Sequence, residues 1–455
     1  MEKSIMEAKR LNIIYIVCHD LGRLLGCYNT PLKTPALDQF AAQGVKFNKA
    51  FCASPCCSPS RGCSMTGMYA HNNGQIGLSH YGWQLPENQK TIVDFFNEAD
   101  YETVHVGFQH ERHWQKNHYQ IDKQTTWDDD KAENAVDAAI KYLKTNANKQ
   151  KPFYLNVGTQ EVHESFFTRN DRLEVYGGPV PDEDVYLPPF VPDTPSLRNY
   201  MAKQIAAIKF LDAQLARLFE AIRTYGYDKN SVVVFTTDHG ISGMRAKGTL
   251  YQAGVETALL MKLPSGMPGG FVVNELINNI DITPTLLEAA GVPVPEQIQG
   301  RSFWPMLVGK EYRPHDEIFM EFNFHGVHKT TVLADDKNPY EDKFDPIRSV
   351  MTKKFHYIRN FDLTLERKWT HVDQIKLNES DQYNKIWPQL VEPRVLEELY
   401  DIEVDPFELK NLSNLNEYTS IKELLSVKLF QWMNDTDDFV LRDEIPQAPG
   451  QHGFF

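Results

Sequence analysis

The amino-acid sequence predicts an α/β fold, with a large mixed, mostly parallel sheet sandwiched by helices and a smaller α+β subdomain that carries an antiparallel sheet. Short apolar runs rich in β-branched residues alternate with amphipathic helical patterns through most of the chain. From about Pro346 the pattern changes to strand-like runs separated by a polar region. The 455 residues, 42% of them hydrophobic, can bury one large core and a second, smaller one. We therefore expect a main domain over 1–345 and a subdomain over 346–455.

Six short runs in the sequence are typical of strands, because they are rich in β-branched and aromatic residues. They are 12–17, 103–107, 153–158, 231–238, 257–263 and 317–322. All six runs alternate with helical patterns, and we expect them to be the strands of the main sheet. Most of these strands should therefore be parallel, with helices on both faces.

Two amphipathic patterns predict long helices between these strands. The first covers 196–226, with Ser196 as the expected N-cap and Gly226 as the stop signal. The second covers 131–147, and a third helix is expected near 416–433. A proline-rich, acidic stretch over 171–195 predicts a long surface loop, and such loops often face the substrate.

The composition excludes several classes of function. A net charge of −14 argues against a nucleic-acid-binding protein, because neutralising phosphates needs a basic face. No apolar run approaches the roughly 20 residues of a membrane span, so we expect no membrane partner. All six cysteines fall within the first 63 residues, which favours reduced thiols over a disulfide framework. The first apolar run lacks a following cleavage site, and we expect a cytoplasmic protein.

Acidic and histidine side chains follow four of the predicted strands. They are His19 and Asp20, His110, Glu161 and His163, and Asp238 and His239. Ligand sites of open α/β sheets lie beyond the carboxyl ends of the strands, so these side chains are expected to converge. Any one of them alone is more often a loop cap or a solvated residue. Two pairs of carboxylate and imidazole together favour a metal site, with further histidines available for proton transfer.

The stretch "FCASPCCSPSRGCSMTG" at 51–67 supplies a candidate nucleophile. Taken alone, its cysteines could be ordinary buried thiols. However, "CSPSR" followed by "MTG" resembles the CxPxR signature of the sulfatase family, in which the cysteine is converted to formylglycine. Counting from Cys57 puts Pro59 and Arg61 in register, whereas counting from Cys56 puts Ser58 in the place of proline.

The resemblance to sulfatases extends over most of the chain. It includes "DHG" at 238–240, "KGTLYQAG" at 247–254, "DITPTLLEAAGVPVP" at 281–295 and "ELYDIEVDPFELKNL" at 398–412. Within the family, "PPFVPDTPSLRNYMAKQIAAIKFLD" and "IRSVMTKKFHYIRN" look most like the N-sulfoglucosamine sulfohydrolases. The resemblance implies an alkaline-phosphatase-like fold and an enzyme that removes sulfate.

The resemblance also implies roles for individual residues. Formylglycine at position 57 would be the nucleophile and a metal ligand, because a hydrated aldehyde offers one hydroxyl for attack and a second for release of sulfate. The other implied metal ligands are Asp20, Asp238 and His239, with His19 beside them. Arg61 and Lys247 would hold negative charge, and His110 and His163 would assist release of sulfate and protonation of the leaving group.

Two positions depart from the family pattern. His19 stands where the family usually has aspartate, and two imidazoles make the site softer than hard cations prefer. We expect Ca²⁺ first, with Mg²⁺, Mn²⁺ and Zn²⁺ as alternatives. Phe108 stands where the family commonly has a lysine, and one lost cationic contact can cost on the order of 10²-fold in rate. His19, Arg112 or Arg245 are candidates to replace it.

The sequence therefore predicts a formylglycine-dependent sulfatase for a sulfated amino sugar, with the N-sulfate of glucosamine from heparin or heparan sulfate fragments as the expected target. Alternatives are a glycan O-sulfatase or arylsulfatase, a phosphonate or phosphate ester hydrolase, and a non-catalytic protein that binds sulfated glycans. Expected partners are the sulfated saccharide and a formylglycine-generating enzyme. The residues expected to bind substrate are Lys247, Glu161, His325 and His328.

Overall fold

The protein contains a large eight-stranded sheet whose strand order is β5-β4-β6-β1-β7-β8-β2-β9. The computed structural model describes residues 10–112, 118–124, 131–243, 245–325, 343–364, 394–444 and 446. The strands are β1 Asn12–Cys18, β2 Val45–Phe47, β4 Glu102–Gly107, β5 Ile121–Gln124, β6 Phe153–Gly158, β7 Ser231–Thr237, β8 Leu259–Lys262 and β9 Phe271–Val273. The strands from β5 to β7 are parallel, whereas β8 is antiparallel to both neighbours. The prediction of a mixed, mostly parallel sheet is confirmed.

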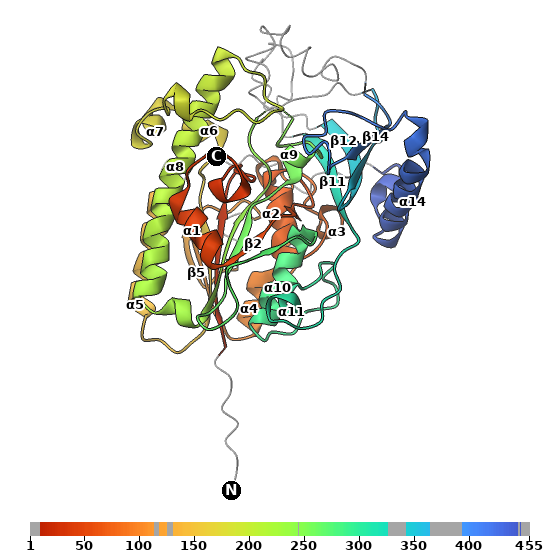
Figure 1. The fold of residues 1–455 in the computed structure, drawn as a ribbon. Helices are drawn as coiled ribbons and strands as arrows, with labels where there is room; N and C mark the ends of the chain where they lie inside the picture. The colour runs from red at the N-terminus through yellow and green to blue at the C-terminus, as the bar shows by residue number, and fades with distance from the viewer. Residues whose placement is uncertain are drawn as a thin grey trace.

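Helices cover both faces of this sheet (Figure 1). The main ones are α1 Pro35–Gln43, α2 Cys57–Thr66, α4 Ile92–Glu98, α5 Ala132–Asn146, α8 Pro195–Thr224 and α10 Ile282–Ala289. Shorter ones are α3 Ala70–Asn73, α6 Glu164–Phe167, α7 Asn170–Val175, α9 Gln252–Val255 and α11 Trp304–Leu307. A short two-stranded sheet pairs β3 Ala50–Phe51 with β10 Ile277–Asn278. The sequence pattern predicted α5 and α8 by their residue ranges but gave no range for the other helices of this domain.

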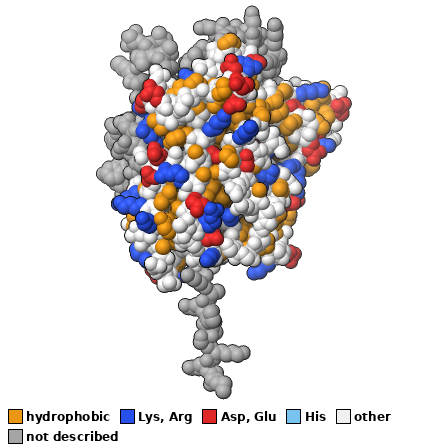
Figure 2. All heavy atoms as spheres, turned by 60° about the vertical axis from the view of Figure 1, so that its left-hand side comes forward, with side chains coloured by type: hydrophobic (Ala, Val, Ile, Leu, Met, Phe, Trp, Pro, Cys, Tyr) orange, Lys and Arg blue, Asp and Glu red, His pale blue; other side chains and the backbone are white. Residues whose placement is uncertain are grey.

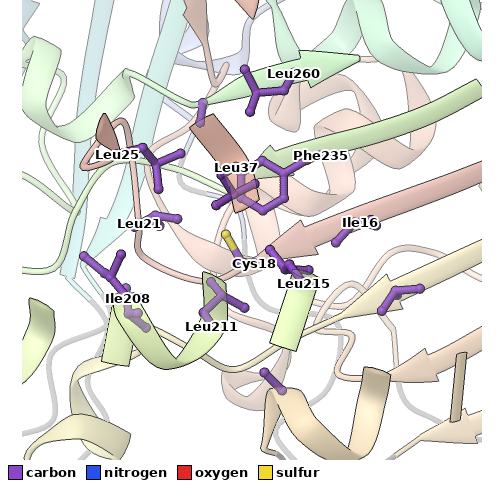
Figure 3. Close-up of a cluster of buried hydrophobic side chains, with 14 of the residues drawn as sticks. Ile16, Cys18, Leu21, Leu25, Leu37, Ile208, Leu211, Leu215, Phe235 and Leu260 are labelled. Atoms are coloured by element: carbon purple, nitrogen blue, oxygen red, sulfur yellow. The ribbon is translucent and has the colours of Figure 1, made fainter. Parts of the chain in front are cut away.

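The central strand β1 divides its side chains between two cores because neighbouring residues of a strand point to opposite faces. Ile14, Ile16 and Cys18 pack with residues of α1, α5 and α8 on one face. Figure 3 shows Ile16 and Cys18 among Leu211 and Leu215 of α8 and Phe235 of β7. On the other face, the intervening residues of β1 pack against α4 and α10. A strand buried on both faces reads as a continuous apolar run, which is how β1 appears in the sequence.

The long helix α8 begins earlier than the sequence analysis placed it. Its N-cap is Thr194 rather than Ser196, since the Thr194 hydroxyl accepts from the Leu197 N–H at 3.3 Å. Pro195 occupies the first helical position, where its missing N–H is no loss. The stretch over 171–195 is also not one long loop, because α7 reaches into it and a 3-10 turn covers Asp182–Asp184.

The C-terminal part forms a separate four-stranded antiparallel sheet, as predicted. Its strands are β11 Glu317–His325, β12 Lys343–Thr352, β13 Phe355–Asn360 and β14 Glu397–Asp401, in that order across the sheet. The helix α14, Thr419–Asp435, packs on it, with the rings of Phe319 and Trp432 stacked 5.0 Å apart. The run at 317–322 was expected in the main sheet, but as part of β11 it belongs to this one. The small sheet thus takes strands from both sides of residue 346.

Charged side chains are mixed in sign on the surface. Figure 2 shows Lys and Arg side chains interspersed with Asp and Glu over one face of the molecule. Of the helices in the described ranges, none combines the length and apolar character that a membrane crossing requires. Figure 1 places the small sheet and α14 on the side of the molecule away from α8.

A buried ionic cluster joins the small sheet to the main domain. The Glu321 carboxylate on β11 accepts from the backbone N–H of His71 at 3.1 Å and lies 2.9 Å from its Nδ1. Arg348 on β12 lies 3.7 Å from Glu321 and makes two hydrogen bonds, of 2.6 and 2.9 Å, to the carboxylate of Asp438. Every side chain in these contacts is buried. Because buried charges are costly when unpaired, this cluster fixes how β11 and β12 meet α3.

The cluster predicts an acid-sensitive contribution to stability. Burial raises the pKa of Glu321, but His71 and Arg348 outweigh burial and lower it to about 2. An unfolded glutamate titrates near pH 4.3, so this contribution is complete above about pH 5 and is lost as the pH falls toward 2. Its size is on the order of 3 kcal/mol. Urea unfolding midpoints measured from pH 7 to pH 3 should therefore fall more steeply for the wild type than for Glu321→Gln.

Glu288→Gln is a suitable control for this experiment, because Glu288 is exposed and its carboxylate accepts from the hydroxyl of Ser302, away from the buried cluster. Its acid profile should follow the wild type. Parallel profiles for the wild type and Glu321→Gln would contradict the assignment.

Candidate functional site

The candidate site lies where the two central strands β1 and β7 end. Cys18 pairs with Thr237 in the parallel ladder, so the residues that follow each strand emerge side by side. The backbone N–H of Asp20 donates to Oδ1 of Asp238 at 3.0 Å. Asp20 itself has a positive φ of 52°, a conformation that aspartate tolerates better than most residues. This turn brings two carboxylates together at the carboxyl edge of the sheet.

Five potential metal ligands converge at this edge. One donor atom from each lies within 4.8 Å of the others, and all five side chains are buried. They are His19, Asp20, Cys57, Asp238 and His239. Nδ1 of His19 lies 2.6 Å from Asp20 Oδ1 and 3.1 Å from Asp238 Oδ2, and His239 Nε2 lies 3.2 Å from Asp20 Oδ1. The structure therefore brings together all the residues that the sequence analysis assigned to the metal.

The electrostatics of the site are dominated by its two carboxylates. Burial raises the pKa of Asp238, but His19, His239 and Arg61 outweigh burial and lower it to about 2. Conversely, burial lowers the pKa of His239, and the charges of Asp238 and Asp20 raise it to about 10. Lys247 is the largest of the influences that hold the pKa of Asp20 well below its usual range against burial. The site therefore has a strong affinity for positive charge.

The donor set fits a divalent cation. His239 Nδ1 lies 2.9 Å from the Gly240 carbonyl oxygen, to which it can donate. When a cation displaces the second ring proton, this tautomer would offer the Nε2 lone pair, and Nε2 has no well-aligned hydrogen-bond partner among the described residues and lies next to Asp20. A metal-binding histidine typically uses its other ring nitrogen in this way. Carboxylates and neutral imidazoles together suit divalent metals from Ca²⁺ to Mn²⁺ and Zn²⁺.

The candidate nucleophile sits at the first position of α2. Cys57 follows the extended N-cap residue Cys56 and is 3% exposed. The hydroxyl of Ser60 donates to the Asp238 carbonyl oxygen, and Arg61 Nε donates to Asp238 Oδ2 at 3.2 Å. These bonds fix α2 against the end of β7. Burial, followed by the contact with Cys56, raises the pKa of the Cys57 thiol, which disfavours a thiolate.

Lys247 and Phe108 complete the inner wall. Lys247 Nζ donates to both Asp20 oxygens, at 2.8 and 2.9 Å. The Phe108 ring lies 5.1 Å from the Arg61 guanidinium carbon and 5.3 Å from the His19 ring. A cation over an aromatic face is favourable, so Phe108 supports Arg61 rather than contributing a charge of its own. Among the proposed replacements for a lysine here, only His19 is at the site.

The two arginines considered as replacements are committed elsewhere. Arg112 donates to the carbonyl oxygens of Gln89 and Pro86. Arg245 donates to the carbonyl oxygens of Phe407 and Glu408. The sequence placed both near the site in the chain, but it could not show where their side chains point.

The two further histidines flank the cluster in neutral form. The ring of His163 packs edge-on against that of His19 at 4.6 Å, and its Nδ1 accepts from the Ser165 N–H at 3.3 Å. The ring of His110 lies 6.5 Å from that of His19. Burial, reinforced by neighbouring positive charges, lowers the pKa of both His110 and His163 well below its usual range. Each can therefore hold or pass a proton without carrying a permanent charge.

One neighbour of the site was missed by the sequence analysis. Nδ1 of His80 lies 3.0 Å from Nε2 of His110, and the two rings are parallel with centroids 5.2 Å apart. His80 lies in a 3-10 turn, Ser79–Tyr81, rather than after a strand. The strand-end rule that found the other histidines therefore could not find it.

Three residues assigned to substrate binding need separate treatment. The Glu161 carboxylate is fully buried, where it accepts from the Ala132 N–H at 2.8 Å and the Tyr176 hydroxyl at 3.1 Å. It therefore supports α5 instead of facing a sugar, and burial raises its pKa to about 7. His325 ends β11, but its side chain, like the whole of His328, lies outside the described residues. The proposed sugar contacts of these two histidines stay predictions.

Comparison with known proteins gives consistent matches along the chain. A family model described as sulfatase matches residues 11–292, and one described as the C-terminal part of N-sulphoglucosamine sulphohydrolase matches residues 240–359. An ulvan-active sulfatase from Formosa agariphila is 28% identical over 98% of this chain and 84% of its own. Human N-sulphoglucosamine sulphohydrolase is 23% identical over 96% of this chain and 92% of its own.

Solved structures agree on the fold. A structure described as a complex with its substrate D-glucosamine-2-N,6-O-disulfate has a TM-score of 0.72 and 18% identity, covering 94% of this chain and 99% of that one. A structure from work on glycosaminoglycan metabolism in Bacteroides thetaiotaomicron has a TM-score of 0.74 and 20% identity, covering 96% and 100%. Because the sulfatase model spans more than half of the sequence, and the residues of its signature meet at one site, the chain belongs to the sulfatase family of enzymes.

Proposed function

We propose that this sulfatase removes the N-sulfate of glucosamine from fragments of heparin or heparan sulfate, with a formylglycine made from Cys57 and a bound divalent cation. The observation that carries the proposal is the convergence of Cys57 with two carboxylates and two imidazoles within 4.8 Å. Action on a sulfated glycan follows from the family and its relatives. The N-sulfate preference is supported by the second family model and by the human relative.

The burial of Cys57 supports its conversion to formylglycine. An unmodified thiol at this place is neutral, because burial raises its pKa, and a neutral thiol is a poor nucleophile. A hydrated aldehyde would supply two hydroxyls on one carbon, one to attack sulfur and one to expel sulfate as the carbonyl reforms. A cation held by His19, Asp20, Asp238 and His239 would supply positive charge that favours the ionised hydroxyl.

The surrounding residues can perform the remaining steps. Lys247 and Arg61 bring fixed positive charge to the place where sulfate oxygens gain negative charge. The Ser165 N–H donates to His163 Nδ1, so the proton of the neutral ring lies on Nε2, which can donate a hydrogen bond to the departing amine or alcohol. His110 is the second proton carrier, and its contact with His80 restricts the ring orientation. The Phe108 ring covers one face of the Arg61 guanidinium group.

A glycan O-sulfatase is the second candidate. The observation that favours it is the 28% identical relative, which is named as active on ulvan. A phosphate or phosphonate ester carries more negative charge than a sulfate ester, and the place held by Phe108 offers no cation for it. The chain is a sulfatase, so the non-catalytic alternative is set aside.

Mass spectrometry of the tryptic fragment 50–61 tests the nucleophile. When the protein is produced together with a formylglycine-generating enzyme, we expect the aldehyde or its hydrate at Cys57 and unmodified thiols at Cys52 and Cys56. Cys56→Ser should still be converted, whereas Cys57→Ser should lose activity by at least about 10³-fold because the two-hydroxyl nucleophile is missing. A thiol at Cys57 beside a converted control sulfatase would overturn the proposal.

A substrate panel tests the sulfated position. We expect sulfate release from N-sulfoglucosamine with a kcat/KM at least about 10-fold above that for glucosamine 6-O-sulfate and for ulvan oligosaccharides. Ion chromatography of released sulfate measures all three on the same scale. A preference for ulvan oligosaccharides would instead support the O-sulfatase candidate.

Metal retention tests the donor set. His239→Ala removes the imidazole donor beside Asp20, so affinity for the divalent cation should fall by at least about 10- to 100-fold. Equilibrium dialysis against Ca²⁺ and against Mn²⁺, followed by elemental analysis, measures this loss without an activity assay. Lys247→Met is the matched control, and it should retain the metal because it leaves every donor in place. Equal retention by wild type and His239→Ala would contradict the assignment.

A further inference from the structure

We propose that Glu408 of the C-terminal part is a positioning residue for Lys247, so that the small subdomain takes part in setting the sulfate-binding site. This inference rests on the role proposed above for Lys247. Residues 245–252, called here the lysine segment, carry Lys247 between β7 and α9 and contain little regular structure. Both ends of the lysine segment are bonded to residues 398–408, far along the chain.

The first end is held by backbone carbonyls of the C-terminal part. Arg245 Nη1 donates to the Phe407 carbonyl oxygen at 2.7 Å, and its Nη2 donates to the Glu408 carbonyl oxygen. Arg245 is 2% exposed, and its guanidinium carbon lies 3.5 Å from the centre of the Tyr251 ring. This cation–π contact ties the two ends of the lysine segment to each other.

The second end is held by two buried carboxylates. Glu408 Oε2 accepts from the backbone N–H of Gln252 at 2.7 Å, and Gln252 Nε2 donates to the Pro406 carbonyl oxygen at 3.1 Å. The Tyr251 hydroxyl donates to Glu398 Oε2 at 2.7 Å. Lys247 makes none of these bonds. The bonds of the residues next to it in the sequence therefore determine where its backbone lies.

Glu408 is built into the small sheet as well. Its side chain is fully buried, and its other oxygen, Oε1, contacts Nδ1 of the buried His356 on β13. Its φ of 55° is a conformation that a glutamate rarely adopts, which the surrounding bonds must maintain. A buried carboxylate with a different partner on each oxygen transmits a shift at β13 directly to Gln252.

The lysine segment is also held by backbone hydrogen bonds to residues of the main domain. The Lys247 N–H donates to the Ile241 carbonyl oxygen at 3.0 Å, and the Gly248 N–H donates to the Pro55 carbonyl oxygen at 2.8 Å. Pro55 lies two residues before Cys57, so the segment is placed between the nucleophile loop and the C-terminal part. A displacement of about 1 Å in a binding group can cost on the order of 10²-fold in rate.

Glu408→Gln tests the proposal because it keeps the shape of the side chain. Its amide oxygen can accept from only one of Gln252 and His356, and its NH₂ group cannot replace the other acceptor while His356 Nδ1 carries the proton. We expect kcat/KM for N-sulfoglucosamine to fall about 10- to 100-fold, and the affinity for inorganic sulfate, measured by calorimetry, to fall by a similar factor. Glu397→Gln is the matched control. Glu397 lies on β14 and bonds to Tyr357 and Lys422, away from the lysine segment, so both quantities should be unchanged.

A double-mutant cycle separates positioning from general structural support. In a Lys247→Met background, Glu408→Gln should change sulfate affinity by less than about 2-fold, because the group that it positions is gone. If it weakens sulfate binding by the same factor in both backgrounds, Glu408 acts independently of Lys247 and the proposal is wrong. If Lys247→Met alone leaves sulfate affinity and turnover intact, the proposed role of Lys247 fails instead. Arg245→Lys, which keeps the charge but loses the two-pronged bond, is the second variant should Glu408→Gln not fold.

Discussion

Two negatively charged carboxylates, buried next to each other, determine how the rest of this site is arranged. The carboxylates of Asp20 and Asp238 are buried next to each other, linked by a backbone N–H of one to an oxygen of the other. Buried like charges repel unless cations surround them. Lys247, Arg61 and the imidazole of His239 all face this pair, and each has a raised pKa. A divalent metal fits this arrangement because it would neutralise the two carboxylates. An anionic substrate fits it because it would neutralise the cationic side chains around them.

The sequence could predict the carboxylates and histidines of this site because they follow strands, whereas Cys57 and Lys247 were assigned from the resemblance to sulfatases. In a parallel sheet, carboxyl ends share an edge, so Asp20 and Asp238 had to meet if β1 and β7 were neighbours. The same rule was wrong for Glu161. That residue also follows a strand, yet its carboxylate bonds to the first turn of α5 and to Tyr176. Position along a strand determines which edge a residue reaches, but the direction of a side chain depends on the local turn.

The sequence analysis predicted a small antiparallel sheet, but it did not assign the run at 317–322 to that sheet. The run that became β11 is apolar and short like the strands of the main sheet, and nothing in its composition shows which partner it will pair with. Partner choice depends on contacts distant in sequence, such as Glu321 with His71 and the backbone bond from Glu321 to Ala53. Glu408 is a similar case, since a charged residue in a polar stretch looks like a surface residue until its partners are known. Long-range polar contacts of this kind leave no periodic signal in the sequence.

The burial of α2 also has a consequence for the order of events during synthesis. All ten of its residues are buried, and the elements that cover it are made later, since Ser60 bonds to Asp238 and to Asn279. A growing chain that has not yet reached those residues cannot close this helix into the core. The proposed modification of Cys57 by another enzyme would therefore have to take place between the emergence of this residue from the ribosome and the docking of the later strands. The speed of translation and folding, as well as the local motif, would then limit the fraction of molecules that mature.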